Sequence, residues 1–416
     1  MNRKNIFLWT LYDFANSIVV VVFFLYFSQW LVVEHGVSDL WYNLIFVGST
    51  VLLIITAPIY GIIADKTGRR LFFLRVTTIW MFVFLLAASL IADFSPQLFF
   101  WAGLAFMVGN YFYQFSFSFY NPMLHDIARP SLQGFVSGLG QMANWLGQIA
   151  GLLVTLPLAA GTIYLVGTHG RAQTFLPATI LFFILSLPML FVFKDPVGSR
   201  KADVNIRQEY KKFFHSFREL IRLPGIGRFL LAYFFFNDAI ITVINNFPIY
   251  LDRVFGVSDR TKSLVLVAIL ITSALGALIS GWVSDKIGLK KTLIIILFGW
   301  VIAFPLMASQ RNFTYFAVIG ILMGFLFGAV WTVARAVMSY LSPDTQLNYS
   351  FSFYTLAERF STFIGPLGWG LTILLLSHLG TVRYHVAMML MGVFVFVGLL
   401  IVRKIPGHSS GEGEVH

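Results

Sequence analysis

Long apolar runs, separated by short polar segments, recur along the whole of this 416-residue chain. A helix needs about 20 consecutive apolar residues to cross a bilayer. We therefore predict an all-α membrane protein with twelve transmembrane helices. They are expected at residues 6–33, 42–64, 71–92, 98–120, 134–157, 174–193, 228–250, 263–284, 291–308, 313–340, 350–376 and 384–402.

One short motif occurs twice, each time where an apolar run ends. GIIADKTGRR covers residues 61–70, and GWVSDKIGLKK covers residues 281–291. Asp285 follows Asp65 by 220 residues (285 − 65), which is about half the chain length. A motif copied at this spacing indicates an internal repeat. The twelve helices are therefore expected to form two pseudo-symmetric six-helix bundles.

The residue types of this motif suggest a role at the cytoplasmic ends of the helices. A glycine before the aspartate would let two helices approach closely, and a glycine after it permits a tight turn. The cations that follow stay on the aqueous side. We predict a cytoplasmic gate made of Gly61, Asp65, Gly68, Arg69, Arg70, Asp285, Gly288, Lys290 and Lys291.

The repeat also sets the domain boundaries. Residues 1–193 form an N-terminal six-helix half and residues 228–404 form a C-terminal one. Residues 194–227 form a central cytoplasmic loop, whose second part has apolar and cationic faces typical of a helix on the inner membrane surface. A solvated linker with a helical piece is the alternative. The tail, 405–416, is expected to be disordered.

Composition supports a membrane protein: 58% of the residues are apolar, 11% are charged and the mean hydropathy is +0.81. The net charge of +11 could suggest a nucleic-acid partner, but Lys and Arg gather in alternate loops. That asymmetry places both termini in the cytoplasm. We expect a lipid bilayer and no nucleic acid as partner. The external loop with Arg253, Arg260 and Lys262 is the one weak point of this assignment.

Polar and charged side chains inside the predicted helices need an explanation, because each charge at the centre of a span costs about 2.5–3.5 kcal/mol. They are expected either to line a substrate path and couple transport, or to pair with one another and cap broken helices. The candidates are Asp13, Asn16, Tyr113, Gln114, Asn121, Asn237, Asp238, Trp331, Arg335, Glu358 and Arg359.

Other patterns concern helix packing and the class of protein. Gly147 and Gly151 predict a close helix contact in span 134–157, and Gly276 with Ser280 predicts another in span 263–284. On the first of these spans, Gln141, Asn144 and Gln148 share one face. The chain shows no metal-ligand spacing, no phosphate-binding glycine loop, and no nucleophile with a base. We therefore predict no enzyme, no metal and no cofactor.

The doubled motif, with G-x-x-x-D-x-x-G followed by two cations, is similar to the signature of the major facilitator superfamily. Three stretches resemble one branch of it: LYDFANS at 11–17, FLLAYFFFNDAIITV at 229–243 and FYTLAERFSTFIGPLGWG at 353–370. That branch includes the fungal vacuolar amino-acid effluxer of autophagy and related bacterial permeases.

The resemblance implies how the twelve helices are used. Spans 1, 4, 7 and 10 would line a central path, and the halves would rock to expose a midplane site to each side in turn. Asp65 and Asp285 would form charge-assisted latches with cations and helix N-termini across the halves. Arg335 is the expected partner of Asp285.

These observations favour a secondary transporter of a small polar solute, with an amino acid as first guess. The path would contain both kinds of charge, with carboxylates at Asp238 and Glu358 and guanidinium groups at Arg335 and Arg359. Such a mixture would suit a zwitterion. A carboxyl group in a low-dielectric cavity can take up and release a proton near neutral pH, so we expect a proton as coupling ion, carried first by Asp238 and second by Glu358. We expect a monomer in the bacterial inner (plasma) membrane.

Two alternatives remain open at this point. The aromatic-rich span 98–120 would favour an exporter of drugs or amphipathic metabolites. A non-transporting membrane receptor or scaffold belongs to a different class. It is disfavoured because the chain has the elements of two gates.

The charge pattern yields a first prediction, on topology. Reporters fused after Lys201 and at the C-terminus should read cytoplasmic, because the adjoining loops are rich in Lys and Arg. A reporter placed near Asp39 or Gln97 should read external. A cytoplasmic signal at Gln97 would contradict the twelve-span assignment.

Overall fold

The computed structural model describes residues 3–128, 133–165, 167–194, 208, 211, 215, 218–219, 221–223, 225–342, 353–354, 357–358 and 361–406. All the regular elements within these ranges are helices. The chain divides into two compact units. Unit 1 comprises Met1–Tyr210 and Val257–Ser263, and unit 2 comprises Lys211–Gly256 and Leu264–His416.

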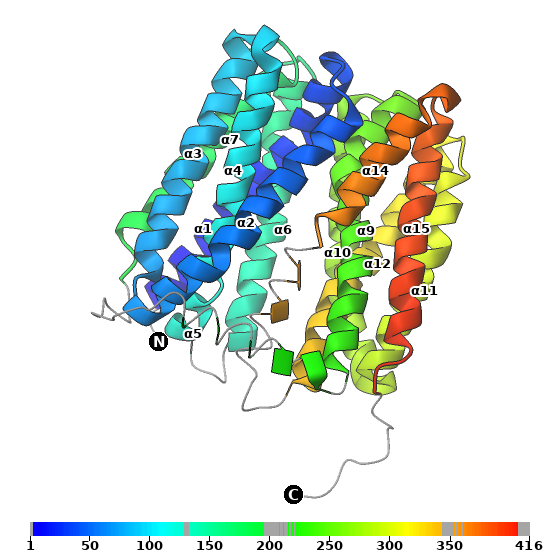
Figure 1. Ribbon diagram of the computed structural model, residues 1–416. Coiled ribbons are helices and arrows are strands. Elements are labelled where there is room, and N and C mark those ends of the chain that lie inside the picture. The colour runs from blue at the N-terminus through cyan, green and yellow to red at the C-terminus, as the bar shows by residue number, and fades with distance from the viewer. Residues whose placement is uncertain are drawn as a thin grey trace, which may run out of the picture. The chain divides into compact units, whose positions relative to one another are not determined.

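Unit 1 is a bundle of long helices (Figure 1). Within it, α3 packs on α4 and α7, α1 packs on α6 and α7, and α2 packs on α4. The helix α1 is extended by the π-helical turns η1 and η2. The elements are α1 (Arg3–Val22), η1 (Phe23–Phe27), η2 (Trp30–Glu34), α2 (Asp39–Thr67), α3 (Arg70–Phe94), α4 (Phe99–Tyr120), α5 (Met123–Ile127), α6 (Gln133–Ala159) and α7 (Phe175–Phe191).

Unit 2 repeats this arrangement with the second set of helices. Here α15 packs on α9 and α11, and α12 packs on α11 and α9. The helix α9 ends in a π-helical turn, as α1 does. The elements are α9 (Ile226–Tyr250), η6 (Leu251–Phe255), α10 (Asp259–Ile287), α11 (Leu289–Ala308), α12 (Phe313–Leu341), α14 (Ile364–Leu375) and α15 (Val382–Val402).

The lengths of these helices suit a bilayer. In the described part of the chain, ten helices are long and apolar enough to cross a membrane. The helix α4 is not among them, although its 22 residues correspond to about 33 Å, because polar residues such as Asn110 and Gln114 interrupt its apolar pattern. The predicted span 350–376 is represented by α14, which has 12 residues. Much of the remainder of that span lies outside the described residues.

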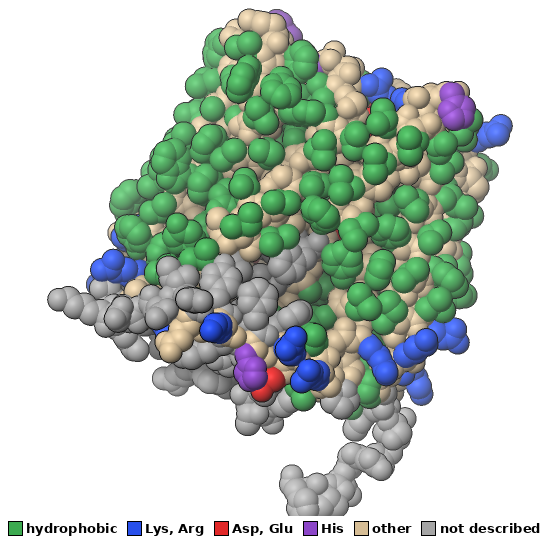
Figure 2. All heavy atoms as spheres, in the orientation of Figure 1, with side chains coloured by type: hydrophobic (Ala, Val, Ile, Leu, Met, Phe, Trp, Pro, Cys, Tyr) green, Lys and Arg blue, Asp and Glu red, His purple; other side chains and the backbone are tan. Residues whose placement is uncertain are grey.

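The outer surface of the helices is apolar. Leu278, Trp282 and Phe298 are each more than half exposed. On the face shown in Figure 2, hydrophobic side chains cover the flanks of the helices, and Lys and Arg gather near the helix ends. Lipid tails rather than water are the medium that suits such flanks.

The repeated motif contains two kinds of glycine, one predicted to permit a tight turn and one predicted to permit close helix approach. Gly68 ends α2 with a φ of 63° and Gly288 separates α10 from α11 with a φ of 91°, so the predicted tight turns are confirmed. A Cβ added at Gly61 or Gly281 would meet nothing within 4 Å among the described residues. The predicted close helix approach at these two positions therefore stays a prediction.

Close helix approach occurs at other glycines. An added Cβ at Gly151 would lie 2.8 Å from the Ile18 carbonyl oxygen, and one at Gly147 would overlap the Phe14 carbonyl. The close helix contact predicted from this glycine pair is thus confirmed, and the structure shows that its partner is α1. The same holds at Gly276, where a Cβ would overlap the backbone of α12 at the Phe325 carbonyl.

The predicted surface helix in the loop 194–227 lies mostly outside the described residues. Its described members at 208, 211, 215, 218–219 and 221–222 are helical. His215 and Glu219 are one helical turn apart and both exposed. The distance from His215 Nε2 to Glu219 Oε1 is 3.1 Å.

The glycine contacts give a prediction about stability. Gly328→Ala should lower the melting temperature of the purified protein, because its Cβ would collide with the Ser273 carbonyl of α10. Overpacking of this kind costs about 1–3 kcal/mol. Gly368→Ala is the matched control: its Cβ would lie 3.5 Å from Leu390, and alanine favours a helix over glycine. Equal melting temperatures for the two variants would contradict the packing argument.

Candidate functional site

In unit 1, a chain of polar side chains links α1 to α6. Asn144 Nδ2 donates a hydrogen bond to Asp13 Oδ1 at 3.2 Å, and Gln148 Nε2 donates to Asn144 Oδ1 at 2.8 Å. Asp13 is buried, whereas Asn144 and Gln148 are partly exposed. The predicted polar face of α6 is therefore real, and it connects a buried carboxylate to an accessible surface.

The other predicted path residues of unit 1 differ in their exposure. Asn16 is fully buried and donates to the Tyr12 carbonyl of its own helix, while its Oδ1 has no partner among the described residues. Gln114 is also buried. Tyr113 is half-buried and Asn121 is exposed. These four residues do not converge on one hydrogen-bonded cluster in the described structure.

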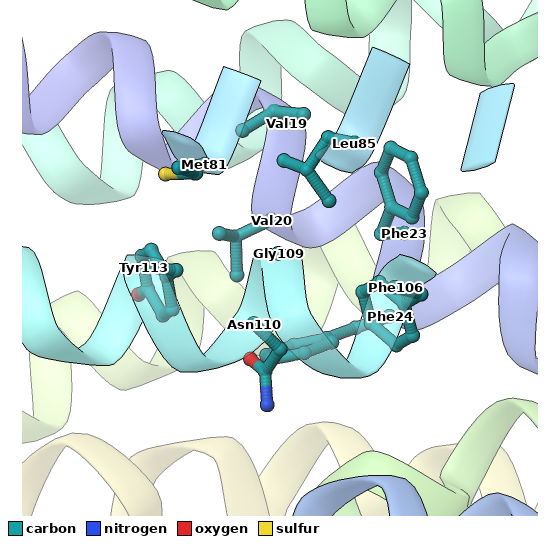
Figure 3. Close-up of a pocket in the computed structure, with 10 residues that line it drawn as sticks. All are labelled: Val19, Val20, Phe23, Phe24, Met81, Leu85, Phe106, Gly109, Asn110 and Tyr113. Carbon is teal, nitrogen blue, oxygen red and sulfur yellow. The ribbon is translucent and has the colours of Figure 1, made fainter. Parts of the chain in front are cut away.

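Tyr113 lines a small pocket between α1, α3 and α4 (Figure 3). Its cavity volume is about 10 Å³, far less than the roughly 300–1,000 Å³ typical of ligand sites. Its lining is apolar except for Asn110 and Tyr113, whereas a polar solute needs several polar partners. The complete lining is Val19, Val20, Phe23, Phe24, Met81, Leu85, Phe106, Gly109, Asn110 and Tyr113.

In unit 2, Asn237 is the centre of a hydrogen-bonded cluster. Trp331 Nε1 donates to Asn237 Oδ1 at 2.8 Å, and Asn237 Nδ2 donates to Ser361 Oγ. Ser361 Oγ also donates to the Glu358 carbonyl oxygen at 2.7 Å. Asn237 and Ser361 are fully buried, and Trp331 is half-buried. The cluster joins α9, α12 and the segment before α14.

Asp238, the next residue, holds the start of α14. Its Oδ2 accepts a hydrogen bond of 2.6 Å from the backbone N–H of Gly365, in the first turn of that helix. A carboxylate at a helix N-terminus satisfies a free N–H group and interacts well with the helix dipole. Gly365 permits this contact, because a Cβ there would lie 2.7 Å from Asp238 Oδ1 and would also overlap the Thr242 hydroxyl.

Two opposite charges lie near a buried tyrosine pair in unit 2. The rings of Tyr233 and Tyr354 have centroids 4.5 Å apart. Glu358 and Arg335 are both near enough to act on these two tyrosines electrostatically. Arg335 is exposed and Glu358 is half-buried, so both are accessible to solvent. Arg359, also predicted for the path, lies outside the described residues.

The predicted cytoplasmic gate is described only in part. Arg70 forms an ion pair of 2.7 Å with Asp126 of α5, and Lys290 donates to the Ile405 carbonyl. Arg69 and Lys291 are exposed. The side chains of Asp65 and Asp285 lie outside the described residues, and so the expected pairing of Asp285 with Arg335 stays a prediction.

Sequence reasoning missed several members of these clusters. Among them are Ser361, Tyr233 and Tyr354. Serine and tyrosine are common in apolar helices, so no sequence signal distinguished these three residues. Thr242 follows Asp238 by one helical turn, which was the one available hint.

Comparison with known proteins now identifies the fold. The sequence profile of the Major Facilitator Superfamily matches residues 8–245 and 229–414. The structure of a D-xylose-proton symporter superposes with a TM-score of 0.75 over 97% of this chain and 98% of that one, at 14% identity. The all-helical fold predicted from the sequence is thereby confirmed.

Two relatives found by sequence similarity are relevant to the branch of the superfamily that the sequence resembles. The uncharacterized MFS-type transporter YxiO of Bacillus subtilis (strain 168) is 22% identical over 419 residues, covering 97% of this chain and 95% of its own length. Autophagy-related protein 22 of Pichia angusta is 27% identical over 176 residues, covering 39% of this chain and 31% of its own. The second match is therefore partial.

The Asp238 contact gives a prediction about stability. Asp238→Ala leaves the Gly365 N–H without its acceptor in apolar surroundings, which costs about 1–3 kcal/mol. The melting temperature of the purified protein should fall, and Asp238→Asn, which keeps an acceptor oxygen, should lose less. Glu358→Ala is the control because Glu358 is half-buried and its side chain shows no hydrogen bond to this helix end among the described residues. Equal melting temperatures for all three variants would exclude the capping role.

Proposed function

The chain belongs to the major facilitator superfamily of secondary transporters, and we propose that it moves a small polar solute, with an amino acid as first candidate, coupled to protons. Membership of this family confirms the sequence-based exclusion of an enzyme. The protein is thus an integral, multi-pass membrane protein that binds a small-molecule substrate.

The observation that carries the proposal is the pair of accessible opposite charges in unit 2. Glu358 and Arg335 both act electrostatically on the Tyr233–Tyr354 pair, and the Asn237–Trp331 hydrogen bond lies in the same unit. An amino acid offers an ammonium group to a carboxylate and a carboxylate to a guanidinium, and charge-assisted hydrogen bonds of this kind are strong. The resemblance of 11–17 and 353–370 to the branch with the fungal amino-acid effluxer supports the same class.

For the coupling proton we propose Glu358 rather than Asp238. Asp238 is fully enclosed, and one of its oxygens is occupied by the Gly365 N–H. A proton bound there would have no direct route to water, and its uptake would weaken the start of α14. Glu358 is partly exposed, so it can exchange a proton with an aqueous path. The sequence alone favoured the reverse order.

A second candidate is an exporter of drugs or amphipathic metabolites. The aromatic side chains of α4, among them Phe106 and Tyr113 (Figure 3), favour it. In either case we propose a monomer in the bacterial inner (plasma) membrane with both termini in the cytoplasm. The similarity to the Bacillus subtilis transporter supports a bacterial membrane.

Counterflow in proteoliposomes tests the substrate class. Vesicles loaded with a pool of unlabelled amino acids should accumulate labelled amino acid by exchange. Exchange of a lipophilic cation but of no amino acid would favour the exporter instead. Saturable binding without any flux would favour a receptor or scaffold.

The same vesicles test the coupling residue. Glu358→Gln should abolish accumulation driven by a pH gradient and keep counterflow, because exchange needs the conformational change without net proton movement. Asp238→Asn is the matched control, and it should keep pH-driven accumulation in the protein that folds. If instead Asp238→Asn loses accumulation while Glu358→Gln keeps it, the proton resides on Asp238.

A further inference from the structure

Asp13, Asn144 and Gln148 of unit 1 form an amide row in which both hydrogen bonds point the same way. A carboxylate oxygen only accepts hydrogen bonds, so Asp13 fixes the amide nitrogen of Asn144 toward itself. The carbonyl oxygen of Asn144 then points away from Asp13, and it accepts a hydrogen bond of 2.8 Å from Gln148 Nε2. The acceptor left at the outer end of the amide row is therefore Gln148 Oε1.

The inner end of the amide row carries a charge that the protein does not neutralise within the described ranges. Asp13 is only 8% exposed, and no Lys, Arg or His of those ranges forms an ion pair with it. A buried carboxylate without a cation is costly. Hydrogen bonds in a chain polarise one another. Because each amide donates toward Asp13, its negative charge makes Gln148 Oε1 a stronger acceptor.

Close packing of α6 on α1 fixes the amide row in place. The helix contacts at Gly147 and Gly151 follow Asn144 along α6, and Gly140 precedes it by one turn. A Cβ at Gly140 would lie 3.5 Å from Asp13 Oδ2, so α6 also lies close to the second carboxylate oxygen. A ligand therefore meets the amide row at its outer end. Because the helix pair is already packed, little ordering is needed for binding.

The outer end of the amide row lies on a different face of α6 from its apolar exposed flank. Gln148 is partly exposed. The apolar flank consists of residues that are each more than half exposed and that share one face by their spacing, namely Met142, Leu146 and Leu153. Lipid suits that flank, whereas an accessible polar side chain inside a span indicates a water-filled cavity or a solute path.

We propose that Gln148 Oε1 binds an ammonium or guanidinium group of the solute, and that the solute is a basic rather than a neutral amino acid. This inference rests on the proposed transport of an amino acid. Glu358 is already proposed for the α-ammonium group that all amino acids share. A basic amino acid adds a second cationic group, which only donates hydrogen bonds and which supplies the positive charge that Asp13 lacks.

The two ends of the amide row have different roles in this proposal. Gln148 touches the cationic group of the solute. Asp13 is a positioning residue, because it acts through Asn144: it orients both amides and polarises them. Without the carboxylate, both amides can turn around. The outer end would then present an N–H group, which does not bind a cation.

Equilibrium binding to the full-length protein in lipid nanodiscs tests the substrate class. The probes are radiolabelled lysine and norleucine, which have the same carbon chain and differ in the terminal ammonium group. Lysine should bind about tenfold more tightly, as expected for one hydrogen bond to a charged group. Equal affinities would overturn this inference and leave the amino-acid proposal intact. If neither probe binds, both proposals are overturned.

Gln148→Leu removes the acceptor with little change in side-chain volume. It should lower the affinity for lysine about tenfold and leave that for norleucine unchanged, because norleucine has no side-chain cation. Gln141→Leu is the matched control, since Gln141 is an exposed amide on the same face of α6, outside the amide row. Its ratio of the two affinities should stay that of the unmodified protein. The same ratio in both variants would overturn the proposal.

Asp13→Asn tests the role of the buried carboxylate. The ratio of lysine to norleucine affinity should fall about as far as in Gln148→Leu. The double variant should show no further fall, because the two residues act through one chain of hydrogen bonds. A purely structural role of Asp13 would weaken the binding of lysine and norleucine equally. That result, or additive losses in the double variant, would overturn the assignment.

Discussion

A polar group inside an apolar helical protein has to be satisfied by the protein itself, and much of this structure follows from that requirement. Lipid offers no hydrogen bond, and an unpaired buried group costs several kcal/mol. Asp13 accepts a hydrogen bond from an amide of α6, one carboxylate oxygen of Asp238 accepts one from the backbone of α14, and Lys262 binds Asp259 and Gln29. Apart from the Lys262–Asp259 pair within α10, each of these contacts ties together elements that are far apart in the sequence.

At two of these contacts, a glycine leaves the space that the buried carboxylate occupies. A Cβ at Gly365 would strike the Asp238 carboxylate, and one at Gly140 would lie 3.5 Å from Asp13 Oδ2 and closer still to the Trp9 ring. The glycines of α6 and of α14 therefore let the helix surface approach a buried carboxylate. At these glycines, close helix packing and the contacts of a buried carboxylate depend on the same feature, because the absence of a side chain permits both.

The two halves share a motif but satisfy their buried aspartates differently. Adding the repeat of 220 residues to position 13 leads to Tyr233, not to Asp238. Asp13 joins a row of amides that reaches an accessible surface, whereas Asp238 closes the start of a helix. The two halves thus share their helices and turns, while the polar contacts of the buried aspartates differ between the units. Such asymmetry suits a protein in which one half contributes most of the substrate and proton contacts.

The sequence by itself determined the helices, the turns at Gly68 and Gly288, the polar face of α6 and the superfamily. These depend on composition, on short-range periodicity and on backbone freedom at single residues. Only the tertiary structure decided that Gly147 and Gly151 pack against α1, that Asp238 caps α14, and that Lys262 reaches Gln29 across 233 positions of the chain. The reason is physical: a contact between two helices depends on which faces are neighbours, and no single helix carries that information.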